Sequence, residues 1–314
     1  MKHIKNIAHP LPFCSLAVTL FGLLSVLLLV QSCTEPITIH TDNSPPVVVI
    51  YSVITSELKV HEVNVSRSSP YFDDVPNQGL SDATVSVYST TANYLFQECD
   101  TLPGTYRSIA PFSAEAGTEY TLKVEVDFNG NVEIFEAQTP IIPVPELDSV
   151  TIRDMPMFGR KGHALYIHAL EPPGKDFYLL NLFKNDTSLT AKLTDFITEE
   201  DNFFEDQYIE MMVERFRDGS EWEDDRVWAS DEEKVRARRR YLWDGDTITL
   251  QLCVIPEGFF NFISQSKSVK NGGNPMFGGP ASNVITNISN GGVGYFAGYA
   301  ISEGKVVYKE EKED

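Results

Sequence analysis

The chain has 314 residues, of which 45 are acidic and 25 are basic, and its formal net charge at pH 7 is −20. A surface of this sign repels the phosphates of DNA and RNA, so nucleic acid is excluded as a partner. Four cysteines are present, and none of them forms a Cys-x-x-Cys or Cys/His zinc pattern.

The N-terminus has the pattern of an export signal. Lys2 and Lys5 precede an almost uninterrupted apolar run from residue 13 to residue 30, and residues 1–32 contain no acid. A basic start followed by an apolar segment is typical of a secretory signal peptide. The run is also about as long as the roughly 20 residues that span a bilayer, so an uncleaved anchor is an alternative. Plain secretion is a third possibility, and each of the three exports the chain.

The residues that end the apolar run are Val30-Gln31-Ser32-Cys33. They resemble a bacterial lipobox, which implies cleavage between Ser32 and Cys33 and a lipid on the Cys33 thiol. Two or more acyl chains hold a protein stably on a membrane. Without residues 1–32, 23 basic and 45 acidic residues remain, a net charge of −22. Such a surface is repelled by anionic headgroups, so we expect a lipid to supply the attachment.

Residues 33–46 are mostly polar, with three prolines, and we predict a flexible tether. Residues 47–140 then show short alternating segments separated by turn residues. We predict strands over 47–54, 59–66, 83–88, 120–126 and 132–137. Turns are predicted at 76–79, 103–104 and 116–117, with a tight hairpin at Asn129-Gly130. The pattern is typical of a β-sandwich, so we predict a mainly β protein that begins with an immunoglobulin-like or transthyretin-like domain.

Three prolines fall between residues 140 and 145, and we predict an interdomain linker over 141–147. A second β-rich domain is expected over 148–304, with strands at 148–152, 164–169, 177–183 and 247–254, and a charged tail over 305–314. Part of the acidic stretch 199–240, which ends in the basic run 236–240, is a candidate helix. A second helix is predicted over 257–267, after Pro256, because the apolar positions 259, 260 and 263 share one helical face.

Several segments, in this order, carry a family resemblance: Asp82-Ala83-Thr84-Val85-Ser86-Val87, Gly104-Thr105-Tyr106, 116–124, Phe216-Arg217-Asp218-Gly219, 245–248, 273–277 and 287–297. With the lipobox cysteine, they make the chain from Cys33 to nearly its end similar to the DUF4249 lipoproteins of Bacteroidetes. Within the segment 287–297, Asn290 stands before Gly291, where the family pattern leads us to expect Ile-x-Gly-Gly. The resemblance implies a lipoprotein of the cell envelope, often encoded beside TonB-dependent outer-membrane receptors, and no catalytic residue.

The residue types give no catalytic, cofactor or metal assignment. Paired carboxylates at Glu199-Glu200 and Asp224-Asp225 are expected from acid density alone, and catalysis would need one of them buried with a raised pKa. Turns around 218–220 and 244–246 lack the spaced acids of an EF-hand. His163 and His168 are five residues apart, which suits no shared strand face, and zinc would need further ligands. Cys99 and Cys253 are expected as buried free thiols rather than a disulfide.

Glycines beside aromatic residues mark possible binding loops at Asn274, Pro275, Met276, Phe277, Tyr295 and Phe296. The sequence therefore predicts a lipid-anchored binding or accessory module of the outer membrane, working with a TonB-dependent receptor or a surface ligand. A hydrolase of peptide or glycan and a structural adhesin remain alternatives, because a β fold alone does not choose among them.

Overall fold

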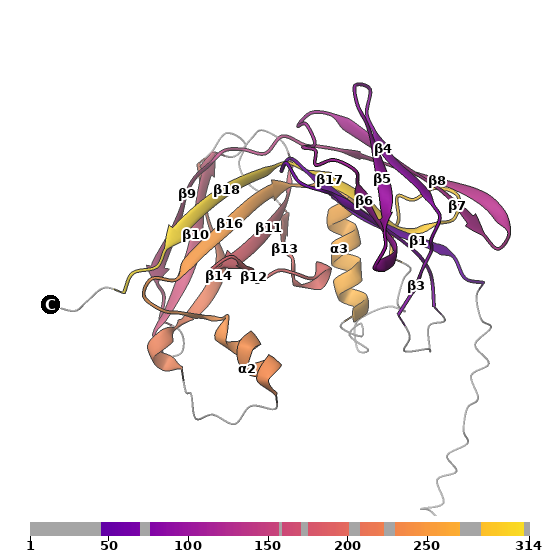
Figure 1. Cartoon of the computed structure of the whole chain (residues 1–314). Coiled ribbons are helices and arrows are strands. Elements are labelled where there is room, and N and C mark those ends of the chain that lie inside the picture. Colours follow the sequence, from indigo (N-terminus) through magenta and orange to yellow (C-terminus); the bar gives the residue numbers. More distant parts are fainter. Residues whose placement is uncertain are drawn as a thin grey trace, which may run out of the picture. The chain divides into compact units, whose positions relative to one another are not determined.

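A computed structural model describes residues 45–69, 76–156, 159–170, 175–200, 208–222, 230–270 and 284–310. These ranges lie within one compact unit, Pro45–Asp314. The unit is mainly β, as predicted, and within the ranges above its strands form three sheets with two α-helices beside them (Figure 1). No helix of these ranges is long and apolar enough to span a membrane.

The largest sheet has nine strands in the order β17-β1-β2-β6-β5-β4-β7-β8, with β3 paired to β2. Their bounds are β1 Val48–Thr55, β2 Glu62–Arg67, β3 Gln78–Gly79, β4 Thr84–Tyr88, β5 Asn93–Cys99, β6 Leu102–Ser108, β7 Glu119–Phe128, β8 Asn131–Pro140 and β17 Val293–Tyr299. The strands predicted within 47–140 are thus confirmed. They form one continuous hydrogen-bonded sheet, and this topology does not confirm the finer prediction of an immunoglobulin-like sandwich.

Local sequence explains the hairpin between β7 and β8. Asn129 and Gly130 both have positive φ, 57° and 83°, as the predicted two-residue turn requires, and Phe128 pairs with Asn131. The predicted turn at Pro103-Gly104 is wrong, since both residues lie inside β6. Gly104 is needed there because a Cβ would lie 2.4 Å from the carbonyl oxygen of Val65.

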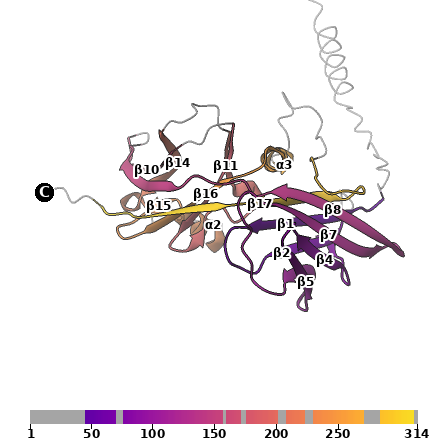
Figure 2. The ribbon, with the colours of Figure 1, turned by 90° about the horizontal axis from the view of Figure 1, so that it is seen from above.

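The strand β17 pairs in parallel with β1, although about 240 residues separate them (Figure 2). One face of this pair contributes Ile50, Ile54 and Phe296 to the core of the nine-stranded sheet. The other face contributes Tyr295 and Tyr299 to a second core. A strand buried on both faces is apolar throughout, which is the physical reason for these aromatic residues. Tyr295 and Phe296 are 6% and 0% exposed, so their prediction as binding-loop residues is wrong.

The segment after residue 284 also covers the edge of this sheet at β8. The Ser289 backbone N–H donates to the Glu136 carbonyl, and the Glu136 N–H donates to Ser289 Oγ, at 2.9 and 2.7 Å. Asn287 reaches the carbonyls of both Gln138 and Phe296. These contacts satisfy backbone groups that an uncovered edge strand would present to other chains.

The remaining strands form a four-stranded sheet, β15-β14-β10-β9, and a five-stranded sheet, β12-β11-β16-β18, with β13 paired to β11. Their bounds are β9 Leu147–Asp154, β10 Gly162–Leu170, β11 Phe177–Lys184, β12 Thr187–Ser188, β13 Ile197–Glu200, β14 Tyr208–Asp218, β15 Tyr241–Leu242, β16 Thr247–Val254 and β18 Ile301–Val307. Both sheets contribute to one apolar core, which includes Leu165, Leu180, Phe216 and Leu250. The strands predicted over 148–304 are confirmed, whereas the sequence patterns did not predict β12, β13, β14, β15, β17 and β18.

The two helices lie where the sequence pattern allowed them. Helix α3, Glu257–Lys270, follows Pro256 as predicted, and its buried Phe259 and Ile263 pack in the core that contains Tyr295. Helix α2, Asp231–Arg238, falls within the acidic stretch and buries none of its side chains. Two short 3-10 helices, Leu193–Asp195 and Gly219–Glu221, complete the structure of the described residues.

The connections between strands differ from the predicted domain division. Ile141, in the predicted linker, is 1% exposed and exchanges backbone hydrogen bonds with Gly117 and Thr118. The predicted second domain, 148–304, supplies β17 to the sheet of the predicted first domain, and β18 extends to Val307 within the predicted tail. Residues 45–314 accordingly form one compact unit.

Replacing Gly294 by alanine tests the importance of the β1–β17 pairing. Gly294 has a φ of 109°, and a Cβ would lie 2.0 Å from the Ile50 carbonyl oxygen. We expect Gly294→Ala to lower the free energy of unfolding by several kcal/mol, because the added atom meets the backbone of the paired strand. Gly291→Ala is the matched control, since Gly291 also has positive φ but nothing lies within 4 Å of its Cβ position. Denaturant unfolding measures both variants. Equal losses in the free energy of unfolding would contradict a specific need for glycine where β17 approaches β1.

Candidate functional site

Two adjoining cavities lie beside α2, which is drawn in orange in Figure 1. The larger, about 600 Å³, is called the α2 groove, and the smaller, about 390 Å³, is called the Trp243 pocket. Val235 and Arg239 of the α2 segment line both cavities. The opposite walls come from β11, β12 and the residues that follow them. A volume of this size is in the range of small-molecule sites in proteins.

Cationic side chains dominate the charge of the α2 groove. Its lining includes five basic residues, Lys192, Arg215, Arg236, Arg239 and Arg240, against three acids, Asp195, Glu214 and Glu232. Arg236 forms an exposed ion pair with Glu232 at 3.2 Å. The other four basic side chains are exposed and form no ion pair with any residue that the structure describes. The groove is therefore a local positive region on a strongly acidic protein.

Local sequence fixes the helix that carries these cations. Ser230 Oγ accepts a hydrogen bond from the Glu233 N–H at 3.1 Å, and acids at 231–233 occupy the first turn, where the helix dipole favours them. Immediately after the helix, the Arg240 carbonyl accepts a hydrogen bond from the Arg217 N–H at 2.8 Å. Tyr241 then pairs with Arg217 as β15 joins β14. The run 236–240 is thus held against the end of β14.

The floor of the α2 groove is apolar. Leu182 and Phe216 line it and are each 1% exposed, while Leu189 and Ile197 pack partly buried against the same core. Hydroxyl groups lie at its wall, and the Leu182 N–H donates to Thr190 Oγ1 at 3.1 Å. The groove therefore combines an apolar surface with basic groups around it.

The Trp243 pocket contains a buried lysine. Lys184 Nζ lies 2.7 Å from Asp246 Oδ2 and 4.4 Å from the centre of the Trp243 ring, and Arg238 lies 5.0 Å from the same ring. Burial lowers the pKa of Lys184, although Asp246 opposes this shift. Burial raises the pKa of Asp246, but hydrogen bonds from Lys184, Trp243 and Asn185 outweigh it and hold the pKa below its usual value. Because Lys184 already has an anionic partner, it is a structural group.

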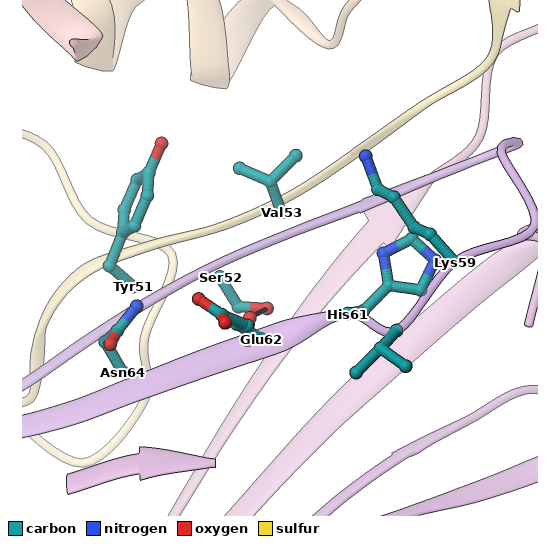
Figure 3. A pocket seen from close by; sticks show the side chains of 8 residues that line it. Tyr51, Ser52, Val53, Lys59, His61, Glu62 and Asn64 are labelled. Atoms are coloured by element: carbon teal, nitrogen blue, oxygen red, sulfur yellow. Dashed lines mark hydrogen bonds between the residues drawn. The ribbon is translucent and has the colours of Figure 1, made fainter. Parts of the chain in front are cut away.

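A third cavity, about 300 Å³, lies at β1 and β2, with Tyr51 and His61 at its opposite ends (Figure 3). Its charged groups are already paired. Lys59 Nζ lies 2.7 Å from Glu57, and Glu62 lies 2.8 Å from Arg107. His61 Nε2 is 2.9 Å from the Phe112 carbonyl, and burial lowers the pKa of His61. This cavity offers a ligand less unpaired charge than the α2 groove.

His163 is the centre of a buried polar network on β10. Its Nδ1 lies 3.0 Å from Asp154, and its Nε2 lies 3.0 Å from both Asp218 Oδ2 and the Tyr308 hydroxyl. Burial raises the pKa of Asp218, but hydrogen bonds from Ser220 and His163 outweigh it, so the pKa is lowered. Burial, together with nearby acids, raises the pKa of Tyr308 to about 12. The network joins the ends of four strands, β9, β10, β14 and β18, and has a structural role.

The residues predicted as sites have different outcomes. Cys33, Ser32 and the loop residues Asn274, Pro275, Met276 and Phe277 lie outside the described residues, as do Asp224 and Asp225. Glu199 and Glu200 are exposed on β13. Cys253 is buried and Cys99 is half-buried, and both thiols are free. In the described ranges, no three His, Cys, Asp or Glu side chains are arranged to hold a metal ion.

The sequence-based interpretation did not identify the α2 groove. Two signals for it are present in the chain: the helix-start pattern Ser230-x-x-Glu233 and the basic run that follows. The side chains of the opposite wall, from 182 to 197, are recognisable only once the fold brings β11 beside β14 and α2.

Replacing Asp218 by asparagine tests the His163 network. A pKa lowered in the folded state stabilises the protein above the unfolded pKa, about 3.8, and this stabilisation is lost as the pH falls through the folded value. At pH 7 we expect Asp218→Asn to lower the free energy of unfolding by about 1–3 kcal/mol. The difference from wild type should shrink below about pH 4, where the wild-type carboxylate also takes up a proton. Urea unfolding of the wild type and the variant at several pH values measures this difference in the free energy of unfolding.

Asp154→Asn is the matched control, because Asp154 contacts the other nitrogen of the same ring but its side chain is 75% exposed. Asp154→Asn should therefore lower the free energy of unfolding by less than Asp218→Asn does. Equal losses for the two variants at pH 7 would contradict a specific role for the buried carboxylate.

Comparisons with known proteins place the chain in a family. No curated protein matches it. A solved structure of a DUF4785 family protein from Legionella pneumophila subsp. pneumophila str. Philadelphia 1 is 9% identical, with a TM-score of 0.25, over 66% of this chain and 51% of that one. The chain thus spans about half the length of that protein. The sequence model of a domain of unknown function, DUF4249, matches residues 34–305. The chain belongs to the DUF4249 family.

Proposed function

We propose that this protein is a lipid-anchored, extracytoplasmic binding module, and that the α2 groove is its ligand site. The observation that carries the proposal is the set of four exposed basic side chains around an apolar floor, Lys192, Arg215, Arg239 and Arg240, which have no carboxylate partner among the residues that the structure describes. Basic groups that converge on one cavity repel one another unless an anion binds between them. Such an arrangement supports binding rather than catalysis, and we propose a non-enzymatic role.

The anchoring part of the proposal rests on the N-terminal sequence. Cys33 follows an apolar run that contains no charged residue, and Val30-Gln31-Ser32 supplies the lipobox-like context. A body with a net charge of −22 gains nothing from adsorption to anionic lipids, so attachment through acyl chains suits it.

An outer-membrane location, with a TonB-dependent receptor as partner, is proposed on the basis of the family resemblance alone. The resemblance implies lipoproteins that are often encoded beside such receptors. Affinity purification of the acylated protein from cells that express a receptor of this class should recover it. Failure to recover it under those conditions would count against the partnership.

Replacing Cys33 by serine tests the anchor. Cells fed a clickable fatty acid should label the wild-type protein, and Cys33→Ser should lose the label and leave the membrane fraction. Cys14→Ser is the matched control, because Cys14 lies in the apolar run without a lipobox around it and should leave labelling unchanged. A labelled Cys33→Ser variant would contradict the lipid assignment. An unlabelled variant that stays in the membrane would favour an uncleaved helix instead.

A further inference from the structure

The lining of the α2 groove has the opposite charge to the rest of the molecule. Five basic and three acidic residues line it, a local excess of two positive charges in a chain whose net charge is −20. The acidic surface elsewhere repels anions in general, so an anion is concentrated at this groove and not over the whole protein. The sign of the local charge favours an anionic ligand.

The types of basic residue narrow the kind of anion. Of the four basic groups in the groove that have no ion-pair partner within the described ranges, three are arginines, Arg215, Arg239 and Arg240. A guanidinium is planar and presents parallel N–H groups that match the two oxygens of a carboxylate or phosphate. They come from two different segments that line the groove, β14 and the run after α2.

The apolar floor of the α2 groove adds a second requirement for the ligand. Leu182 and Phe216 lie beneath it and are each 1% exposed, so the apolar surface that a ligand can reach comes from the partly buried Leu189 and Ile197. Val235, on the α2 side, is 53% exposed although it lines both cavities. An inorganic ion would leave this apolar surface in water, whereas a ligand with a hydrocarbon part covers it at about 25 cal/mol per Å² of buried area.

We infer that the ligand is a small organic anion with a carboxylate or phosphate group on an apolar body. The oxyanion lies against Arg215, Arg239 and Arg240, and the apolar body lies on Leu189, Ile197 and Val235. This inference rests on the proposed role of the α2 groove as the ligand site, and it names the chemical class that the groove takes.

Calorimetric titration of the full acylated chain in phosphatidylcholine nanodiscs tests the inference, with empty nanodiscs as the blank. The probes are hexanoate, hexyl phosphate, hexanol and inorganic phosphate. We expect saturable one-to-one binding of hexanoate or hexyl phosphate. Hexanol lacks the charge and inorganic phosphate lacks the apolar part, so each should bind about tenfold more weakly or worse. The tighter of the two organic anions shows whether the natural group is a carboxylate or a phosphate.

The variant that locates the site is the double substitution Arg239→Gln, Arg240→Gln. Both side chains are exposed and form no ion pair within the part of the chain that the structure describes, so folding should be retained, and the thermal unfolding midpoint checks this. Loss of two charge-assisted contacts should weaken binding by about tenfold or more. Arg107→Gln is the matched control, since Arg107 is an exposed arginine on β6, far from the groove in sequence and paired with Glu62, and it should bind as the wild type does.

Three results would overturn the inference: no binding of either organic anion, equal binding by the double variant, or inorganic phosphate binding as tightly as hexyl phosphate. Failure of the inference and failure of the anchor are separable. Absent anion binding with Cys33 labelled would contradict the ligand class alone. Groove-dependent binding by a chain that carries no lipid would contradict the anchor alone.

Discussion

The apolar core between the four-stranded and five-stranded sheets is the constraint on which the candidate site depends. Leu182 of β11 and Phe216 of β14 are each 1% exposed in this core, and both also form the floor of the α2 groove. Close packing fixes these side chains, because a shift of either strand would open a cavity in the core. The groove is therefore built on rigid strands, although the basic residues around it come from exposed segments.

A second constraint joins the two ends of the sequence. The parallel pairing of β1 with β17 places β17 in the nine-stranded sheet. The next strand, β18, belongs to the five-stranded sheet, where it pairs with β16. The two halves consequently share strands, and no hinge at residues 141–147 is needed to describe them. The buried contacts of Ile141 with Gly117 and Thr118 are part of the same connection.

Strand positions were predictable wherever alternation or a continuous apolar run was clear, as for 120–126 and 247–254, because one or both faces of those strands are buried. Other elements could not be predicted. Pro103-Gly104 has the composition of a turn but lies in a strand where Gly104 approaches Val65 closely. Tyr295 and Phe296 follow glycines and resemble loop residues, and only their pairing with β1 explains their burial. The α2 groove depends on contacts between segments far apart in sequence, which local patterns do not contain.

The most direct test is a crystal structure of the protein grown with hexyl phosphate. The phosphate oxygens should lie within hydrogen-bond distance of Arg215, Arg239 or Arg240, with the hexyl chain over Leu189, Ile197 and Val235. A phosphate held elsewhere, for example at the β1–β2 cavity near Lys59, with the α2 groove free of ligand, would contradict this placement of the ligand.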